Sequence, residues 1–243
     1  MIVISKDDPQ GLADTLNSIR EQSFRDFEVV VVAKGRSAAA ASGGELPALV
    51  VVEQAGNGIS DAFNLGLSRA RGRWINFLNG GDRYAGADSL ATAAQAMQTG
   101  VAVVSALAVD AKTGVQIPRA RSFAARDLEL VSHQASFFDA ALFERHGHYS
   151  PTFRIRMDFE WMLRLPRDTR TAWLDTRLVA FEGNGISTVR PLRSSVEELR
   201  ALKAHGKGAG RMLSLLCLYV PWRLARHGWR RMTIHRYGEL GSR

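Results

Sequence analysis

The chain has 243 residues, of which 46% are hydrophobic and 23% charged, a composition typical of a globular protein and not of a disordered one. The net charge of +8 is concentrated at one end, because residues 200–243 hold ten Lys or Arg and one acid and therefore carry +9, which leaves −1 for residues 1–199. Since the body is nearly neutral, nucleic-acid binding by the whole protein is not expected. The single cysteine, Cys217, excludes an internal disulfide and a cysteine zinc site, which fits a reducing compartment.

The first part of the chain predicts strands that alternate with a helix. Three runs rich in valine and isoleucine are expected to be strands, the first of them buried: residues 2–5, 28–33 and 49–53. Between the first two, Leu12, Leu16 and Ile19 recur at helical spacing behind Pro9. This β-α-β order indicates a parallel sheet. Residues 37–44 are small and predict a flexible loop.

Residues 58–72 predict the next helix. Ser60 is expected to be its N-cap, and Asp61 places negative charge in the first turn, where the helix dipole favours it. Gly72 stands where a left-handed residue would end the helix.

A strand and a glycine-rich turn follow this helix. Residues 74–78 form an apolar run broken only by Asn76, as expected of an interior strand. Gly80 and Gly81 then lead to Asp82. A carboxylate at the carboxyl end of an interior strand lies where open α/β sheets bind their ligands.

The second half of the chain predicts fewer elements. A helix, a strand, a turn, a short returning strand and a final strand are expected in this order: residues 87–99, 101–109, 110–114, 115–117 and 171–181. Asp158 is expected to open a helix whose Trp161, Met162 and Leu165 face the core.

Several of these stretches resemble one known family. Gly58-Ile59-Ser60-Asp61-Ala62-Phe63-Asn64, followed by Phe77-Leu78-Asn79 and Asp82, resembles the signature of the family 2 glycosyltransferases. Further matches occur in blocks between residues 2 and 187, the resemblance being strongest at 58–82 and 133–164: Leu16 to Glu28, His133-Gln134 with Phe137-Phe138, Asp158 to Arg164, and Gly185-Ile186-Ser187. The resemblance implies an α/β fold of the GT-A type, a Rossmann-like mostly parallel sheet flanked by helices. We expect this domain over residues 1–190 and a helical, basic extension over residues 191–243.

The resemblance also implies an activity and residue roles. Family 2 enzymes of this kind move a sugar, with inversion, from a nucleotide-diphosphate donor to a hydroxyl, here of a glycan or lipid-linked acceptor. A UDP-sugar is the expected donor. Asp158 matches the general base, and Asp82 matches the ligand of a divalent cation, Mn²⁺ or Mg²⁺. The resemblance implies donor contacts for five residues: Asp61, Asn64, Asn79, His133 and Gln134.

Three positions depart from the family pattern. Ala33 replaces an aspartate that normally helps to hold the nucleotide base, Leu65 replaces a lysine, and Gly81 replaces the first aspartate of the metal motif. Asp7 or Asp8 could substitute for the carboxylate missing at Ala33. The departures leave open a competing class, a non-catalytic nucleotide-sugar-binding or scaffold protein of a polysaccharide assembly system.

The residue roles have plainer alternatives as well. Asp82 would be a turn aspartate, Asp158 a helix N-cap, and His133 a histidine whose polar atoms are satisfied in the core. Glu160 is expected to form a salt bridge with a neighbour. Three arginines are further candidates for contact with phosphates: Arg154, Arg156 and Arg164.

The basic end of the chain predicts contact with a membrane surface through residues 208–236. Residues 212–220 are apolar but fewer than the about 20 needed for a membrane span. Beyond them, Trp222 and Trp229 share a helical face that lies next to arginines, a pattern typical of a helix at an anionic membrane interface. A helix packed on the domain is the alternative, and nucleic-acid binding by the tail ranks third. With strand-like sequence from Ile2 onward, we expect a cytoplasmic protein, peripheral on the inner face of the membrane.

Overall fold

The computed structural model describes residues 1–40, 46, 49–56, 58–116, 120, 123, 128, 131–182 and 190–206. The chain divides into two compact units, Met1–Gly183 and Asn184–Arg243. The described part of the second unit contains helix α8 (Pro191–Ala204). The predicted membrane-contact segment 208–236 and the Gly185-Ile186-Ser187 match lie outside the described residues.

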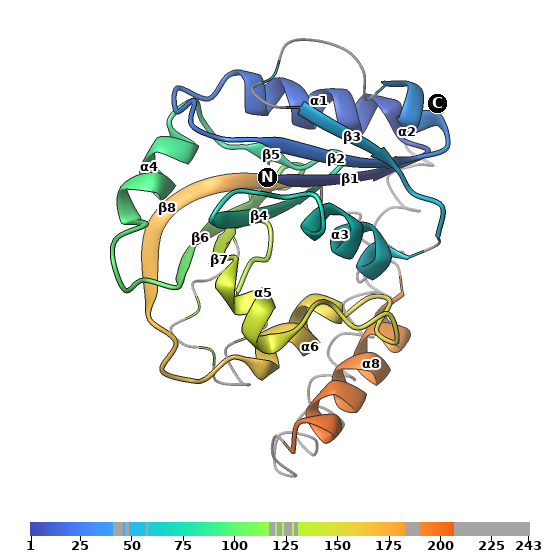
Figure 1. The fold of residues 1–243 in the computed structure, drawn as a ribbon, viewed down its shortest axis with the longest axis vertical. Helices are drawn as coiled ribbons and strands as arrows, with labels where there is room; N and C mark the ends of the chain where they lie inside the picture. The colour runs from blue at the N-terminus through green and yellow to red at the C-terminus, as the bar shows by residue number, and fades with distance from the viewer. Residues whose placement is uncertain are drawn as a thin grey trace, which may run out of the picture. The chain divides into compact units, whose positions relative to one another are not determined.

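An eight-stranded sheet with the order β3-β2-β1-β4-β7-β6-β8-β5 organises the first unit (Figure 1). Its strands are β1 (Ile2–Lys6), β2 (Val29–Lys34), β3 (Leu49–Glu53), β4 (Trp74–Asn79), β5 (Arg83–Tyr84), β6 (Val103–Asp110), β7 (Ser136–Asp139) and β8 (Thr171–Phe181). The strands β3, β2, β1 and β4 are parallel, whereas β7 runs antiparallel to both β4 and β6. Strand β8 is parallel to β6 and antiparallel to β5. The predicted mixed α/β architecture is confirmed.

Helices flank the sheet on both faces. The first unit contains α1 (Pro9–Arg20), α2 (Arg36–Ala40), α3 (Ile59–Leu67), α4 (Ser89–Ala96), α5 (Ala141–His146) and α6 (Met157–Arg164). Helices α1 and α2 lie on one side of the parallel strands and α3 on the other (Figure 1). Asp8 caps α1 by accepting a hydrogen bond from the Gly11 N–H at 2.9 Å, and Pro9 occupies the first turn. Its buried face contains Leu12, Leu16 and Ile19, as the periodicity predicts.

Three local predictions are wrong, each because a tertiary contact decides the structure. Residues 37–40 of the predicted loop belong to α2, whose Ser37 hydroxyl accepts a hydrogen bond from the Asp8 N–H. Ser60 is not the N-cap: it lies inside α3, after Gly58, and its hydroxyl donates to the Phe153 carbonyl. Helix α3 ends at Leu67, five residues before Gly72, whose N–H instead donates to the Glu28 carboxylate.

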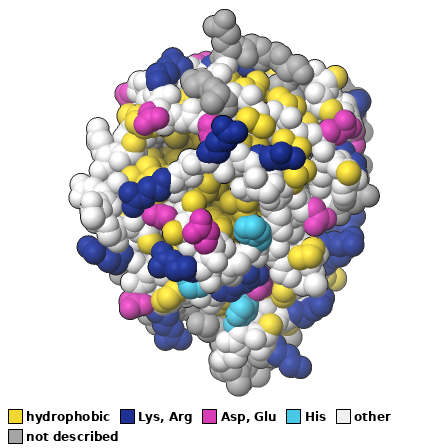
Figure 2. Space-filling view, in the orientation of Figure 1, with side chains coloured by type: hydrophobic (Ala, Val, Ile, Leu, Met, Phe, Trp, Pro, Cys, Tyr) yellow, Lys and Arg dark blue, Asp and Glu magenta, His cyan; other side chains and the backbone are white. Residues whose placement is uncertain are grey.

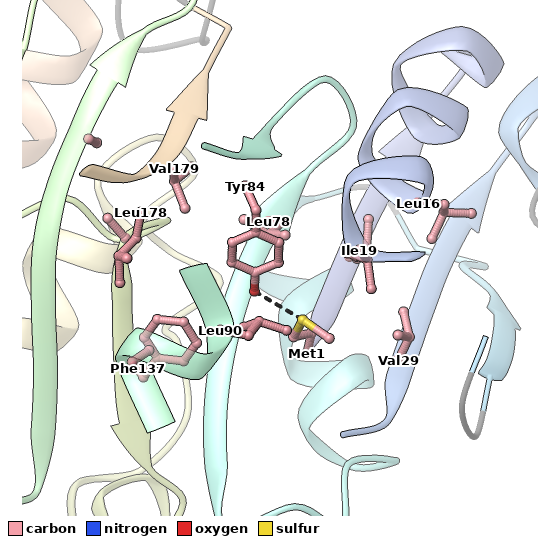
Figure 3. Packing of buried hydrophobic residues seen from close by; sticks show 14 of the residues in the cluster. Met1, Leu16, Ile19, Val29, Leu78, Tyr84, Leu90, Phe137, Leu178 and Val179 are labelled. Atoms are coloured by element: carbon pink, nitrogen blue, oxygen red, sulfur yellow. Dashed lines mark hydrogen bonds between the residues drawn. The ribbon is translucent and has the colours of Figure 1, made fainter. Parts of the chain in front are cut away.

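The main hydrophobic core lies between α1 and the sheet (Figure 3). Leu16 and Ile19 from α1 pack toward Val29 and Leu78 from the strands. Tyr84 brings a hydroxyl into this core. It donates to Asn76 Oδ1 at 2.8 Å and lies 2.9 Å from the Met1 sulfur, so this buried polar group is satisfied.

A cleft of about 520 Å³ opens at the amino ends of β1 and β4. Hydrophobic side chains surround a hollow near the centre of the face on which β1 begins (Figure 2). The cleft lining includes Met1, Phe27, Trp74 and Met97. Because ligand sites of open α/β sheets lie at the carboxyl ends of the strands, this cleft is at the opposite edge from the expected donor site.

We predict that Gly66→Ala destabilises the protein, because a Cβ at this position would lie 2.3 Å from Ile2 Cγ2 in the core. Overpacking costs about 1–3 kcal/mol, which exceeds the gain of about 1 kcal/mol from replacing a helix glycine. Gly86→Ala is the matched control, since a Cβ there meets nothing within 4 Å. Urea unfolding measures both. A Gly66→Ala protein as stable as the Gly86→Ala protein would contradict the close approach of α3 to β1.

Candidate active site

The carboxyl ends of the parallel strands bring four segments to one edge of the sheet. Ser5 pairs with Ala33, Ala33 pairs with Glu53, and Ile4 pairs with Asn79, so these strands end at the same level. The residues that follow each strand therefore meet at this edge. They include the predicted site residues at 79–82.

Asp82 is held in a tight turn after β4. Its Oδ2 accepts hydrogen bonds from the backbone N–H of Asn79 at 2.8 Å and from the Asn79 side chain at 3.0 Å. Gly81 has a φ of +95°, a conformation that favours glycine, and its N–H bonds to Thr15 Oγ1 and the Gly11 carbonyl. Asp82 is only 3% exposed, and this burial raises its pKa to about 6 although the Asn79 hydrogen bonds oppose the shift.

The donor atoms at this turn suit a hard divalent cation. The Oδ1 atom of Asp82 has one long contact, 3.4 Å from the Glu182 N–H, and is the less engaged carboxylate oxygen. Across the described residues, no group of three or more His, Cys, Asp or Glu is arranged to hold a metal ion. A cation at Asp82 would need further oxygen ligands from elsewhere, and phosphate oxygens are of the kind that Mg²⁺ accepts.

The position of the missing family aspartate is filled by a buried alanine. Ala33 has no exposed surface. Of the two nearby carboxylates, Asp8 is committed to capping α1. Asp7 is exposed at a φ of +54°, and its carboxylate accepts a hydrogen bond from the Arg36 N–H at 3.2 Å. Base recognition by a carboxylate stays a prediction, for which Asp7 is now the better candidate.

A second group of site residues surrounds Tyr149, which local sequence patterns do not mark. His133 is buried, its ring stacks on Phe77 with centroids 4.8 Å apart, and its Nε2 lies 2.7 Å from the Tyr149 hydroxyl. Asn64 donates to the Tyr149 carbonyl at 2.8 Å and accepts from the Tyr149 N–H at 3.0 Å. His133 and Asn64 are thus brought together by one tyrosine. Their contact with a donor stays a prediction.

Asp158 lies in the first turn of α6 and is half-buried. It is the second residue of the helix and accepts a hydrogen bond from the Phe159 N–H, so it is not the N-cap. Its negative charge is close enough to raise the pKa of His133, although burial lowers that pKa more strongly. The charge of Asp158 also adds to burial in raising the pKa of Tyr149. Asp158 thus lies within electrostatic range of His133 and Tyr149.

Three of the four charged residues near Asp158 contact other groups of the protein. Glu160 forms the expected salt bridge, with Arg164 one helical turn away. Arg164 also donates to two backbone carbonyls, those of His146 and His148. The guanidinium of Arg156 lies over the Phe159 ring, and Arg154 is exposed.

Two predicted donor contacts lie near the ends of elements. Asp61 is exposed in the first turn of α3. Gln134 is half-buried just before β7, and its carbonyl accepts a hydrogen bond from Asn76. Their roles stay predictions.

Solved structures share this fold. The mannosyltransferase PcManGT from Pyrobaculum calidifontis, in complex with GDP-Man and Mn²⁺, matches with a TM-score of 0.67 and 19% identity over 93% of this chain and 72% of its own. S. aureus TarS 1–349 in complex with UDP matches with a TM-score of 0.62 and 16% identity over 84% of this chain and 64% of its own. The match spans 38% of a longer TarS chain. The fold is that of the GT-A glycosyltransferases.

Sequence comparison gives the family. The model of glycosyl transferase family 2 matches residues 1–174. An uncharacterized glycosyltransferase of Mycobacterium tuberculosis is 31% identical over 215 residues, 83% of this chain and 81% of the relative. A PGL/p-HBAD biosynthesis glycosyltransferase of Mycobacterium bovis is 29% identical over 164 residues, 61% of this chain and 62% of the relative. The chain belongs to glycosyl transferase family 2 and is a glycosyltransferase.

We predict that burial of His133 makes the protein less stable in mild acid. Burial lowers the pKa of His133 below its usual 6.5, so the unfolded chain takes up a proton at a higher pH than the folded chain does. The free energy of unfolding should therefore fall as the pH drops below about 6.5. In the His133→Gln variant this part of the pH dependence should disappear.

Urea unfolding at pH 7.5 and 5.5 measures the effect, and the difference between wild type and variant isolates His133 from Asp82, whose raised pKa acts in the opposite sense. His148→Gln, at an exposed histidine, is the control. An unchanged pH dependence in His133→Gln would show that the buried ring does not titrate in this way.

Proposed function

We propose that the protein transfers a sugar from a nucleotide-diphosphate donor to a hydroxyl of a glycan or lipid-linked acceptor, with inversion at the anomeric carbon. The observation that carries the proposal is the turn after β4, which holds the Asp82 carboxylate at the carboxyl end of the parallel strands. Complexes of fold relatives with UDP, UDP-GlcNAc and GDP-Man support a nucleotide-sugar donor.

On the donor side, Asp82 would hold a divalent cation together with the diphosphate. Such a cation supplies positive charge that stabilises the diphosphate as it leaves. Asn79 fixes the orientation of the carboxylate through its two hydrogen bonds to Oδ2, which leaves Oδ1 as the atom directed at a ligand. The Mn²⁺ in the PcManGT complex supports this assignment. A UDP-sugar remains the donor to test first.

On the acceptor side, Asp158 would act as the general base. Its carboxylate takes the proton of the acceptor hydroxyl while that oxygen bonds to the anomeric carbon. The bond between the anomeric carbon and the diphosphate oxygen breaks at the same time, and its electron pair leaves with the diphosphate. Asp158 is half-buried in the first turn of α6, so part of its side chain remains accessible.

Action at a membrane surface is proposed from the sequence alone. No helix within the described ranges is long and apolar enough to cross a membrane. Contact of residues 208–236 with an anionic membrane surface, and a position on the cytoplasmic face, rest on the excess of arginine beside Trp222 and Trp229.

We predict that Asp82→Ala abolishes the stabilisation of the protein by Mn²⁺ together with a nucleotide diphosphate. Thermal shift with UDP or GDP, each with and without Mn²⁺, measures this effect. Asp82→Asn serves as a second variant that keeps the shape of the turn, and Asp26→Ala removes an exposed carboxylate elsewhere as a control. If both Asp82 variants respond to Mn²⁺ plus nucleotide as the wild type does, the metal role is wrong.

We also predict that Asp158→Asn folds and binds the nucleotide diphosphate while transfer falls by about 10²–10⁴-fold, the usual contribution of a general base. The amide keeps the size of the carboxylate and an oxygen that accepts from the Phe159 N–H. Release of UDP or GDP from the nucleotide sugar measures turnover. Wild-type turnover by a folded Asp158→Asn protein would remove Asp158 from the mechanism.

A further inference from the structure

Side-chain hydrogen bonds connect helix α3 to residues 149–153, which precede α6 in the chain. Ser60 donates to the Phe153 carbonyl at 2.8 Å. Asn64 makes a two-way pairing with the Tyr149 backbone, donating at 2.8 Å and accepting at 3.0 Å. The partners are 93 and 85 residues apart in sequence. These bonds, which we call the α3 clamp, hold residues 149–153 against α3.

Helix α6 binds the residues just before this segment. The indole N–H of Trp161 donates to the Gly147 carbonyl at 2.7 Å. The Arg164 guanidinium donates to the carbonyls of His146 at 3.0 Å and His148 at 2.9 Å, and is itself held by Glu160. The chain from 146 to 153 is therefore fixed between α3 and the helix that carries Asp158.

Tyr149 connects both sets of contacts to the buried aromatic cluster. Its side chain is 2% exposed and its hydroxyl lies 2.7 Å from His133 Nε2. Its ring contacts Phe77 of β4 and Trp161 of α6, with centroid distances of 5.4 Å and 5.9 Å. Since an unpaired buried polar group costs about 1–3 kcal/mol, this arrangement strongly favours one geometry of the segment.

We infer that Asn64 and Ser60 are positioning residues that set the place of Asp158 relative to the donor edge of the sheet. The inference rests on the proposed role of Asp158 as general base. Both ends of the Asn64 amide are used by the Tyr149 backbone, and the Ser60 hydroxyl is 93 residues from its partner in sequence and buried with it. Asn64 and Ser60 thus hold residues 149–153 in place. In this role they do not contact the donor directly.

Accurate placement of a base matters because a displacement of about 1 Å can cost about 10²-fold in rate. Loss of the α3 clamp would let Asp158 move while the turn at 79–82, which is held by Thr15 and Gly11, stays in place. The expected signature is a loss of kcat without a loss of nucleotide affinity. A residue that contacts the donor would instead weaken nucleotide binding.

The test is a double-mutant cycle with Asn64→Ala, Asp158→Asn and the variant that combines them. Turnover is measured as UDP or GDP released from UDP-GlcNAc or GDP-Man with water as acceptor, and affinity as the Kd of UDP or GDP with Mn²⁺. Asn64→Ala should lower kcat by about 10²-fold and leave the Kd unchanged within about twofold. In the Asp158→Asn background, Asn64→Ala should lower kcat by less than about threefold. The two substitutions should not be multiplicative, because both remove the same function, that of the positioned base.

Ser60→Ala removes a single bond of the α3 clamp and keeps the inference testable if Asn64→Ala folds poorly. It should lower kcat in the same direction by a smaller factor. Hydrogen exchange gives a readout that needs no turnover: amides of residues 150–158 should exchange faster in either variant, and those of residues 79–82 should not. Asn17→Ala, at an exposed asparagine of α1, should change none of these quantities.

Three results would overturn the inference: an increase in the nucleotide Kd that accounts for the loss of turnover, multiplicative effects in the double variant, or unchanged exchange over residues 150–158. The Asp158→Asn single variant separates these from failure of the proposed function. If that variant alone turns over at the wild-type rate, the base assignment fails. If it is inactive and the double variant is multiplicative, the base assignment stands and the positioning role fails.

Discussion

The whole site depends on the two pairing modes of β4. This strand is parallel to β1 on one side and antiparallel to β7 on the other, and so joins the parallel half of the sheet to the mixed half. The buried Asn76 secures the junction, because its amide N–H groups donate to the carbonyls of Gln134 and Ser136 and its oxygen accepts from Tyr84. The turn with Asp82 leaves one end of β4, while the segment containing His133 enters β7 beside it. The turn that holds Asp82 and the segment that contains His133 are thereby both fixed relative to β4.

The parallel half of the fold could be predicted from the sequence, because its strands are short runs rich in valine and isoleucine, of which β1 and β2 are buried and β3 is a partly exposed edge strand. The final strand, Thr171–Phe181, was predicted with the bounds it has in the structure. The mixed half was harder, since β5 has two residues and β7 four, too few for any periodicity to show. Serine is a favourable N-cap residue, yet the Ser60 hydroxyl donates to the Phe153 carbonyl, 93 residues away in sequence. Local sequence patterns cannot reveal such a distant partner.

The same limit applies to the site. Asp82 and Asp158 could be named because their neighbours match a family signature. A salt bridge of Glu160 was also expected, although its partner, Arg164, is known only from the structure. Tyr149 could not be named, because the structure uses its backbone and its hydroxyl, and neither leaves a pattern in the sequence. Asn64 was recognised as a signature residue, but only the fold shows that both ends of its amide face a backbone. A signature position can therefore serve the geometry of a site without touching its ligand.

The glycine at the family's aspartate position limits what can replace it. Gly81 adopts a φ of +95°, and a Cβ built on it would lie 3.0 Å from Glu182 Oε2. A side chain here would be strained in that backbone conformation, and the Glu182 carboxylate would have to shift. Adding the family's aspartate would therefore disturb the same turn whose hydrogen bonds hold Asp82.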